Sequence, residues 1–321
     1  MQAATILRRY SIQIGVTCIL LALVALFMVL SPKTFLASRI YISFLSTIPF
    51  TTLLAVGLTF CIVSGEMDIS FPAVMALSGL IFAMVFKATG SPLLGLIACL
   101  ATGMVAGLGN GVLVVGFGVP SIIATIGTQF LWRGLAVVLA DGLARNIVDV
   151  RDTWIHSLFV GRLWDVIPAQ AIWCLLLCVA AWLILNRHVY GDSLLFIGDN
   201  IRTARMTGVS VSRERILLFA GMGLISAFVS FLICLEMANW WPTMGEGYML
   251  LVFASVFIGG TSVFGGKGTI YGTAIGSIII GIIEAGVISS GLSGFWTRLV
   301  YGMIIVISVS IYALTLKTRR E

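Results

Sequence analysis

The 321-residue chain carries very little charge. Only 10% of its residues are charged and 60% are apolar, and its mean hydropathy is +1.11. A soluble globular protein has roughly 25% charged and about 45–50% apolar residues. The shortage of charge excludes a soluble domain large enough to fold alone, and it indicates that most of the surface faces lipid. We therefore expect one transmembrane domain over residues 1–321.

Residues that carry enzymatic chemistry are also scarce. The chain has two histidines, and it contains no H-E-x-x-H, no G-x-S-x-G and no cysteine cluster. The six cysteines fall inside apolar runs without metal-ligand spacing, as small buried side chains do. A glycine-rich string around Lys267 fails as a phosphate loop, because Thr261 replaces its first glycine and Gly268 replaces its Ser or Thr. We expect no catalytic residue, metal site or bound cofactor.

Long apolar runs dominate what is present. A helix rises 1.5 Å per residue, so roughly 20 apolar residues cross a hydrocarbon core of ~30 Å. We predict an all-α polytopic membrane protein with about ten spans, at 11–30, 42–63, 69–86, 92–115, 120–140, 166–185, 215–236, 248–264, 270–290 and 297–315. The third and eighth spans are short, and either could be re-entrant or broken. Such backbone survives at membrane depth only inside protein or beside a wet cavity.

Basic residues predict that both termini face the cytoplasm. With an even number of spans, eleven basic residues fall on the cytoplasmic side and six on the outer side, as the positive-inside rule requires. The cytoplasmic set is Arg8, Arg9, Arg187, Arg202, Arg205, Arg213, Arg215, Lys267, Lys317, Arg319 and Arg320, and the outer set is Lys33, Arg39, Lys87, Arg145, Arg151 and Arg162. These loops explain the formal net charge of +6 without nucleic-acid binding.

The cytoplasmic loop at about 187–214 contains a short helix signal. Asp199 or Asn200 can cap a helix of about seven residues, which Gly208 can end in a left-handed conformation. A helix this short needs a docking partner to be stable. Its two-faced pattern suits a plug for a protein socket, and the alternative is a solvated basic loop.

Ionisable and aromatic residues near the predicted spans leave alternatives open. Glu66 and Asp68 either lie solvated at the cytoplasmic surface or line a polar path. Arg133 and Arg298 either face the bundle or reach a membrane interface, and their places near span ends favour the interface. Glu284 either pairs inside the bundle or lies nearer the surface than its predicted span places it. The Trp240–Trp241 pair suits an interfacial anchor or a surface on which a sugar ring stacks.

Four ordered motifs carry a family resemblance. They are GEMDIS with ALSG at 65–70 and 76–79, NG with PSIIATIGT at 110–111 and 120–128, IGDN with TAR and TGV at 197–200, 203–205 and 207–209, and the glycine-rich segment 258–276. Over about residues 40–312, the chain resembles the permease subunits of bacterial ABC importers for ribose and related sugars. Glu66, Phe71-Pro72, Asp199 and Glu284 depart from the family pattern, which leaves the solute open.

The resemblance implies an inner-membrane permease that works as a dimer. Its partners would be a cytoplasmic ATPase that uses ATP and Mg²⁺, a periplasmic solute-binding protein, a second permease and membrane lipid. The residues that match the ATPase-coupling segment are Gly198, Asp199, Asn200, Arg202, Ala204, Arg205 and Gly208. Our hypothesis for the translocation path comprises Glu66, Asp68, Ser70, Phe71, Asn110, Thr125, Trp240 and Glu284. The alternatives are an ATPase-independent facilitator or secondary transporter, and a scaffold without transport.

Overall fold

The computed structural model describes residues 11–318, and this part of the chain is all-α apart from four two-residue strands. The first six helices are α2 (Ser11–Leu30), α3 (Pro32–Phe35), α4 (Ser38–Val63), α5 (Phe71–Thr89), α6 (Pro92–Gly116) and α7 (Ser121–Leu139). The middle elements are β1 (Arg145–Asn146), the 3₁₀ helix η1 (Val148–Asp152), α8 (Trp154–Val160), β2 (Arg162–Leu163), β3 (Ile167–Pro168), α9 (Ala169–Arg187), α10 (Val189–Asp199) and α11 (Ile201–Met206). The last are α12 (Val211–Met237), β4 (Asn239–Trp240), α13 (Tyr248–Ile258), α14 (Ile270–Ser289) and α15 (Phe295–Thr318).

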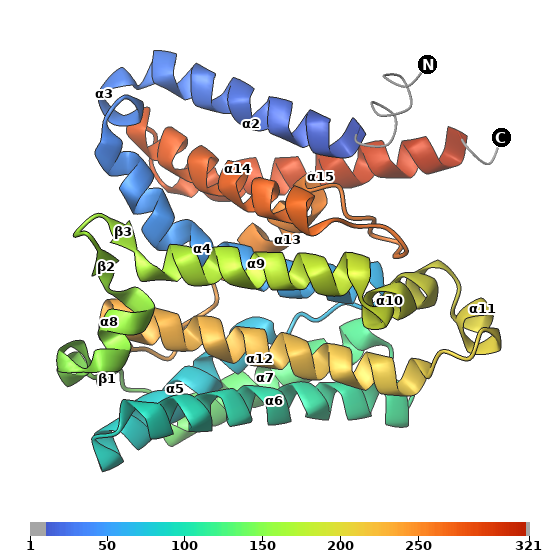
Figure 1. The fold of residues 1–321 in the computed structure, drawn as a ribbon, viewed down its shortest axis with the longest axis horizontal. Helices are drawn as coiled ribbons and strands as arrows, with labels where there is room; N and C mark the ends of the chain where they lie inside the picture. Colours follow the sequence, from blue (N-terminus) through green and yellow to red (C-terminus); the bar gives the residue numbers. More distant parts are fainter. Residues whose placement is uncertain (1–10, 319–321) are drawn as a thin grey trace.

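The long helices run roughly along one axis and give the bundle two distinct ends (Figure 1). One end carries α8 and the antiparallel pairs β1–β4 and β2–β3, and we name it the α8 end. The other carries α10 and α11, and we name it the α11 end. The start of α2 and the finish of α15 both lie at the α11 end (Figure 1), which agrees with an even number of spans. The predicted orientation rests partly on four basic residues that lie outside the described residues, namely Arg8, Arg9, Arg319 and Arg320.

The helix pattern confirms the polytopic fold with roughly ten spans. Eight of the described helices are long and apolar enough to cross a membrane, namely α2, α4, α5, α6, α7, α9, α12 and α14. The other two predicted spans correspond to α13 and α15. The predicted end of the eighth span at residue 264 was wrong, because α13 stops at Ile258 and Gly260 takes a φ of +82°. With 11 residues, α13 is only about 16 Å long and is a half-helix.

The centre of the bundle is α12, which packs closely on α6. Gly103, Gly107 and Gly111 recur every four residues along α6. A Cβ atom added at any of the three would touch or overlap the backbone of α12. Gly223 offers the same opening from the α12 side. This spacing of small residues lets the two backbones approach, which is how helices associate where no water drives them together.

The connector between α4 and α5, residues 64–70, runs back into the bundle from the α11 end. Its last residue, Ser70, accepts a hydrogen bond from Asn110 Nδ2 at 2.7 Å. Asn110 lies six residues before the end of α6, so Ser70 is about 9 Å inside that end. Connector 64–70 is therefore irregular backbone enclosed by helices, and the expected break before the third span lies here.

The connector between α12 and α13, residues 238–247, enters the bundle from the α8 end. Ser230 Oγ lies 3.3 Å from Met244 Sδ, and Ser230 is seven residues before the end of α12. Connector 238–247 thus descends about 10 Å along α12. Gly245, with a φ of +90°, packs directly on the backbone of Pro72 at the start of α5. The two connectors enter from opposite ends and meet inside the bundle.

Candidate functional site

At the α11 end, α10 forms an arm that leaves the span α9 in a sharp turn. The turn requires Gly191, because a Cβ there would collide with the carbonyl oxygens of Ile184 and Leu185. His188 Nδ1 accepts a hydrogen bond from the Tyr190 N–H at 3.1 Å and caps α10. Burial raises the pKa of the Tyr190 phenol above its ordinary value, so the group stays neutral at this junction.

Both predicted ends of α11 are confirmed. The Asn200 side-chain oxygen accepts hydrogen bonds from the N–H groups of Arg202 at 3.0 Å and Thr203 at 3.2 Å. These two bonds satisfy donors that a helix start leaves free. After the helix, Gly208 has a φ of +85°, which a residue with a side chain rarely adopts. The cap and the stop are local effects, and they fix where α11 begins and ends.

One face of α11 is docked and the other is exposed. Ala204 is only 1% exposed, and its neighbours in a small apolar cluster are Ile197, Val209 and Val211. Arg202, Arg205 and Asp199 are exposed, and Met206 is 88% exposed. The docking partner that so short a helix needs is therefore this cluster, while a mixed basic and apolar face stays free.

Gly198 lies where three backbone segments meet. The Gly266 N–H donates a hydrogen bond to the Val63 carbonyl oxygen at 2.8 Å. Gly198 packs against both of these groups so closely that a Cβ atom would overlap them. Gly265, with a φ of +84°, packs on the backbone of Gly198 and Gly65 from the other side. The arm that carries α11 is thus in direct backbone contact with the end of α4 and with the glycine-rich connector 259–269.

Connector 64–70 holds a buried polar cluster next to this junction. Asp68 Oδ1 accepts hydrogen bonds from the Ser70 N–H at 2.8 Å and from Ser70 Oγ at 2.6 Å. A carboxylate at this position also stabilises the positive N-terminal end of α5. Asn110 Nδ2 donates to Ser70 Oγ, and Thr125 Oγ1 lies 3.4 Å from the Met67 carbonyl oxygen. Four residues of the path hypothesis, from three elements, therefore meet here.

Glu66 belongs to the same connector but pairs with α12. Its carboxylate lies 2.5 Å from the Arg215 guanidinium, and the two side chains are 9% and 18% exposed. Of the two alternatives for Glu66 and Asp68, solvation at the surface does not match these burials. Arg215 was expected only as one of the basic cytoplasmic residues, so its pairing was not predicted.

Arg133 of α7 joins connector 238–247 to the start of α5. Its guanidinium donates hydrogen bonds to the carbonyl oxygens of Pro242 at 2.6 Å, Met244 at 2.8 Å and Pro72 at 3.1 Å, and its Nε lies 3.9 Å from Glu246. The expectation that this side chain reaches a membrane interface was wrong. Irregular backbone at membrane depth leaves carbonyl groups without partners, and a fork of five donors can satisfy several at once.

Phe71 and Trp240 lie in the packing of α5. Phe71 is the first residue of that helix, and both side chains are fully buried. The Trp240 indole N–H donates to the Ala76 carbonyl oxygen at 2.8 Å. The two rings therefore pack against and around α5 and are not available to stack on a solute from solvent.

Glu284 lies apart from the polar cluster of connector 64–70. It projects from α14 into a cavity of about 370 Å³ between α4, α13 and α14. α4 begins and α14 ends at the α8 end, so this cavity belongs to that half of the bundle (Figure 1). The residues of the path hypothesis therefore fall into four places: the polar cluster, the Glu66–Arg215 pair, the packing of α5, and the Glu284 cavity.

Comparison with known proteins gives a consistent picture. The family profile described as "Branched-chain amino acid transport system / permease component" matches residues 40–309. The ribose import permease of Bacillus subtilis is 33% identical over 290 residues, 90% of this chain and 89% of the relative. The L-arabinose transport system permease of Escherichia coli is 31% identical over 258 residues, 80% of this chain and 77% of the relative.

A further relative, the autoinducer 2 import system permease of Salmonella paratyphi A, is 29% identical over 306 residues, 89% of each chain. No solved structure matches the chain. The family match begins near the start of α4 and runs into α15, so it contains α11, both connectors and the Glu284 cavity. On the strength of the family match over residues 40–309, the chain belongs to the permease components of the branched-chain amino acid transport system type.

Proposed function

We propose that this chain is the membrane subunit of an ATP-driven importer in a bacterial inner membrane, and that it moves a monosaccharide or a related small polar solute. The observation that carries the proposal is α11, a capped helix with a free basic face, in a chain whose relatives are named as ribose, arabinose and autoinducer 2 import permeases. We infer that the α11 end faces the cytoplasm and the α8 end faces outward.

The free face of α11 suits a cleft on a cytoplasmic ATPase. Arg202 and Arg205 offer charge, and Met206 offers an adaptable apolar side chain. A displacement of α11 would reach α10 and then Gly198, which is in backbone contact with Val63 and with connector 259–269. ATP and Mg²⁺ would be used on the partner, and α10, α11 and connector 259–269 of this chain would move in response.

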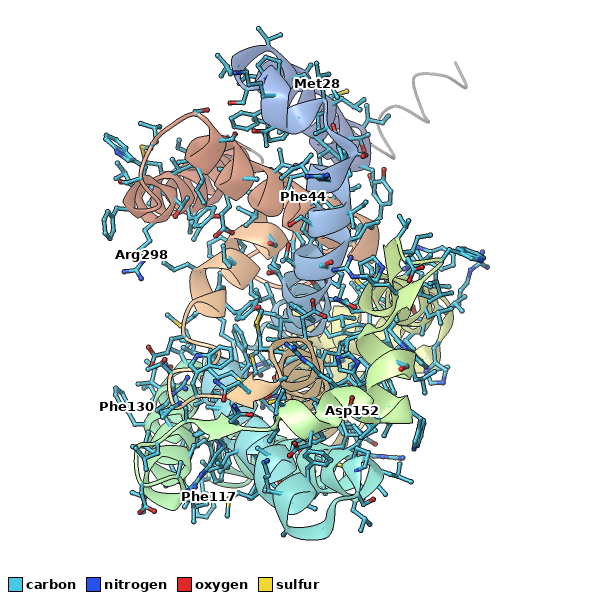
Figure 2. All side chains as sticks on the ribbon, turned by 90° about the vertical axis from the view of Figure 1, so that its left-hand side faces the viewer. Met28, Phe44, Phe117, Phe130, Asp152 and Arg298 are labelled. Atoms are coloured by element: carbon cyan, nitrogen blue, oxygen red, sulfur yellow. The ribbon has the colours of Figure 1, made fainter. Side chains whose placement is uncertain are left out.

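A second permease fits one edge of the bundle. α7 and α15 expose apolar side chains there, including Phe130 at 75% and Val306 at 65%. Figure 2, which looks onto the α8 end, shows Phe130 and Arg298 projecting at the same edge. Exposed apolar faces between spans are covered by lipid or by protein, and two such faces along one edge of the bundle suit a partner of the same kind. A periplasmic binding protein would deliver solute at the α8 end.

The test is a charge reversal on α11, Arg202→Glu with Arg205→Glu, in a tagged chain expressed with its ATPase. Both side chains are exposed, so the double variant should insert and fold normally. We expect co-purification of the ATPase to fall by at least tenfold and uptake to be lost. The matched control is Arg213→Glu, an exposed arginine at the same end but outside α11.

The outcomes separate the candidate functions. Loss of the ATPase in the α11 variant, with retention in the control, supports the importer. Normal ATPase binding and uptake in the α11 variant would overturn the assignment of α11. A wild-type chain that transports solute with no ATPase bound would instead be a facilitator or secondary transporter.

A further inference from the structure

The cavity around Glu284 has the dimensions of a small-molecule site. Its volume of about 370 Å³ lies within the roughly 300–1,000 Å³ that ligand pockets occupy. On α4 the lining runs from Ile40 to Thr51, about 16 Å along the helix, starting close to the α8 end. The polar side chains of the lining are Ser43, Thr47, Thr51, Tyr248, Ser277 and Glu284.

The lining offers both hydrogen-bond acceptors and donors. Thr47 Oγ1 donates its proton to the Ser43 carbonyl oxygen at 3.1 Å, and Ser277 Oγ donates to the Thr273 carbonyl oxygen at 3.1 Å. Because these protons are used within the helices, the two hydroxyls offer lone pairs to a ligand, and Glu284 adds two carboxylate oxygens. The hydroxyls of Ser43, Thr51 and Tyr248 can donate as well as accept. A ligand that fits must therefore carry several groups that donate and accept hydrogen bonds.

Among the side chains that the structure describes, the carboxylate has no basic partner: no lysine, arginine or histidine lines the cavity, and no ion pair involves Glu284. An ionisable group between membrane spans needs a partner or water, and such groups mark substrate or ion pathways. The remaining walls are apolar, and Phe44 and Tyr248 provide aromatic rings. A small bare ion would use neither these rings nor most of this volume.

We propose that the cavity is a solute-binding site in which the two Glu284 oxygens accept hydrogen bonds from adjacent hydroxyls of a neutral polyol. The hydroxyls of Thr47 and Ser277 accept further ones, and Phe44 with Tyr248 covers the C–H face of the solute. The inference rests on the proposed import function and adds a place where the solute is held at the α8 half. Glu284 is there a specificity-determining residue.

The first experiment establishes the solute. Uptake of aldopentoses and aldohexoses, D-ribose and L-arabinose among them, is measured for the wild-type complex with and without ATP. If no sugar is imported in an ATP-dependent way, the proposed function fails before the cavity is tested. The imported sugar is then the probe for the binding site.

The second experiment reads binding directly. Ser43→Cys places a thiol on the cavity wall, in a Cys18→Ser background because Cys18 is the exposed native cysteine of the described chain. We expect a membrane-impermeant maleimide to label Ser43→Cys from outside, and the imported sugar to protect it. Adding Glu284→Gln should raise about tenfold the sugar concentration that gives half-maximal protection, as expected for the loss of a hydrogen bond to a charged acceptor.

A third measurement compares uptake rates at saturating sugar. Glu284→Gln should lower the rate about tenfold, whereas Asp165→Asn should leave it within twofold. Asp165 is an exposed carboxylate of the β2–β3 turn with a φ of +58°, a conformation that asparagine tolerates. No labelling from outside, equal protection in both Glu284 forms, unchanged uptake, or protection by Na⁺ but not by the sugar would each overturn the proposal.

Discussion

Gly198→Ala should destabilise the protein by an amount that can be worked out from the backbone junction at this residue. The added Cβ would overlap the Val63 carbonyl oxygen and the Gly266 nitrogen, and both are backbone atoms that cannot rotate away. Overpacking of this kind costs about 1–3 kcal/mol. Loss of the Gly266–Val63 hydrogen bond costs a further ~0.5–1.5 kcal/mol, and the better helix propensity of alanine returns about 1 kcal/mol. The net destabilisation should be about 0.5–3.5 kcal/mol.

The assay is thermal unfolding of the detergent-purified permease together with ATP-driven uptake. A loss of about 0.5–3.5 kcal/mol should lower the melting temperature of a chain of this length by roughly 1–5 °C. Uptake should fall further than this loss explains, with the ATPase still bound, because the free face of α11 is unchanged. Gly221→Ala is the control: Gly221 also lies inside a helix, but a Cβ there meets nothing within 4 Å. If Gly198→Ala behaves like Gly221→Ala in both measurements, the reasoning is refuted.

Three other substitutions test the packing of the two connectors. Glu66→Gln removes one partner of a largely buried ion pair and should cost about 3–5 kcal/mol of unfolding free energy. The exchange Glu66→Arg with Arg215→Glu should recover part of that loss, as measured by melting temperature. No recovery would count against a specific pair. Arg133→Lys cannot reach three carbonyl groups, so amide exchange in connector 238–247 should be at least tenfold faster; an unchanged rate would contradict the role of Arg133. Trp240→Phe removes the hydrogen bond that the indole adds to a helical carbonyl of α5 and should cost about 0.5–1.5 kcal/mol in unfolding experiments; a neutral effect would contradict a contribution from that bond.

The spans and α11 could be predicted because the forces that define them act locally. An apolar run of sufficient length is helical wherever it lies in lipid, and the expected span 11–30 matches Ser11–Leu30. Asn200 and Gly208 act on backbone groups within three residues, so the ends of α11 are also legible from the sequence. For the third and eighth spans, the sequence predicted only that they are short and could be re-entrant or broken.

The depth of the connectors could not be predicted, because it depends on contacts between distant residues. An arginine near the end of an apolar run suits an interfacial position equally well. What decides for Arg133 is three carbonyl groups that lie 61, 109 and 111 residues away in the sequence. Glu66 of connector 64–70 and Arg215 of α12 are likewise far apart in the sequence. Their charges suggest a partner, but only the packing of connector 64–70 on α12 identifies it.

The contacts form a continuous route between the two halves of the bundle. Gly198 contacts Val63, where connector 64–70 begins, and that connector leads to Pro72. Pro72 and connector 238–247 share the Arg133 guanidinium, and connector 238–247 leads to Tyr248 at the Glu284 cavity. Gly245 of connector 238–247 also packs directly on the Pro72 backbone, so the step through the Arg133 side chain has a backbone contact beside it. A shift along the route therefore cannot be absorbed by a side chain changing rotamer. An alternating-access permease needs this property, because a change at the ATPase must alter a solute site in the opposite half of the membrane.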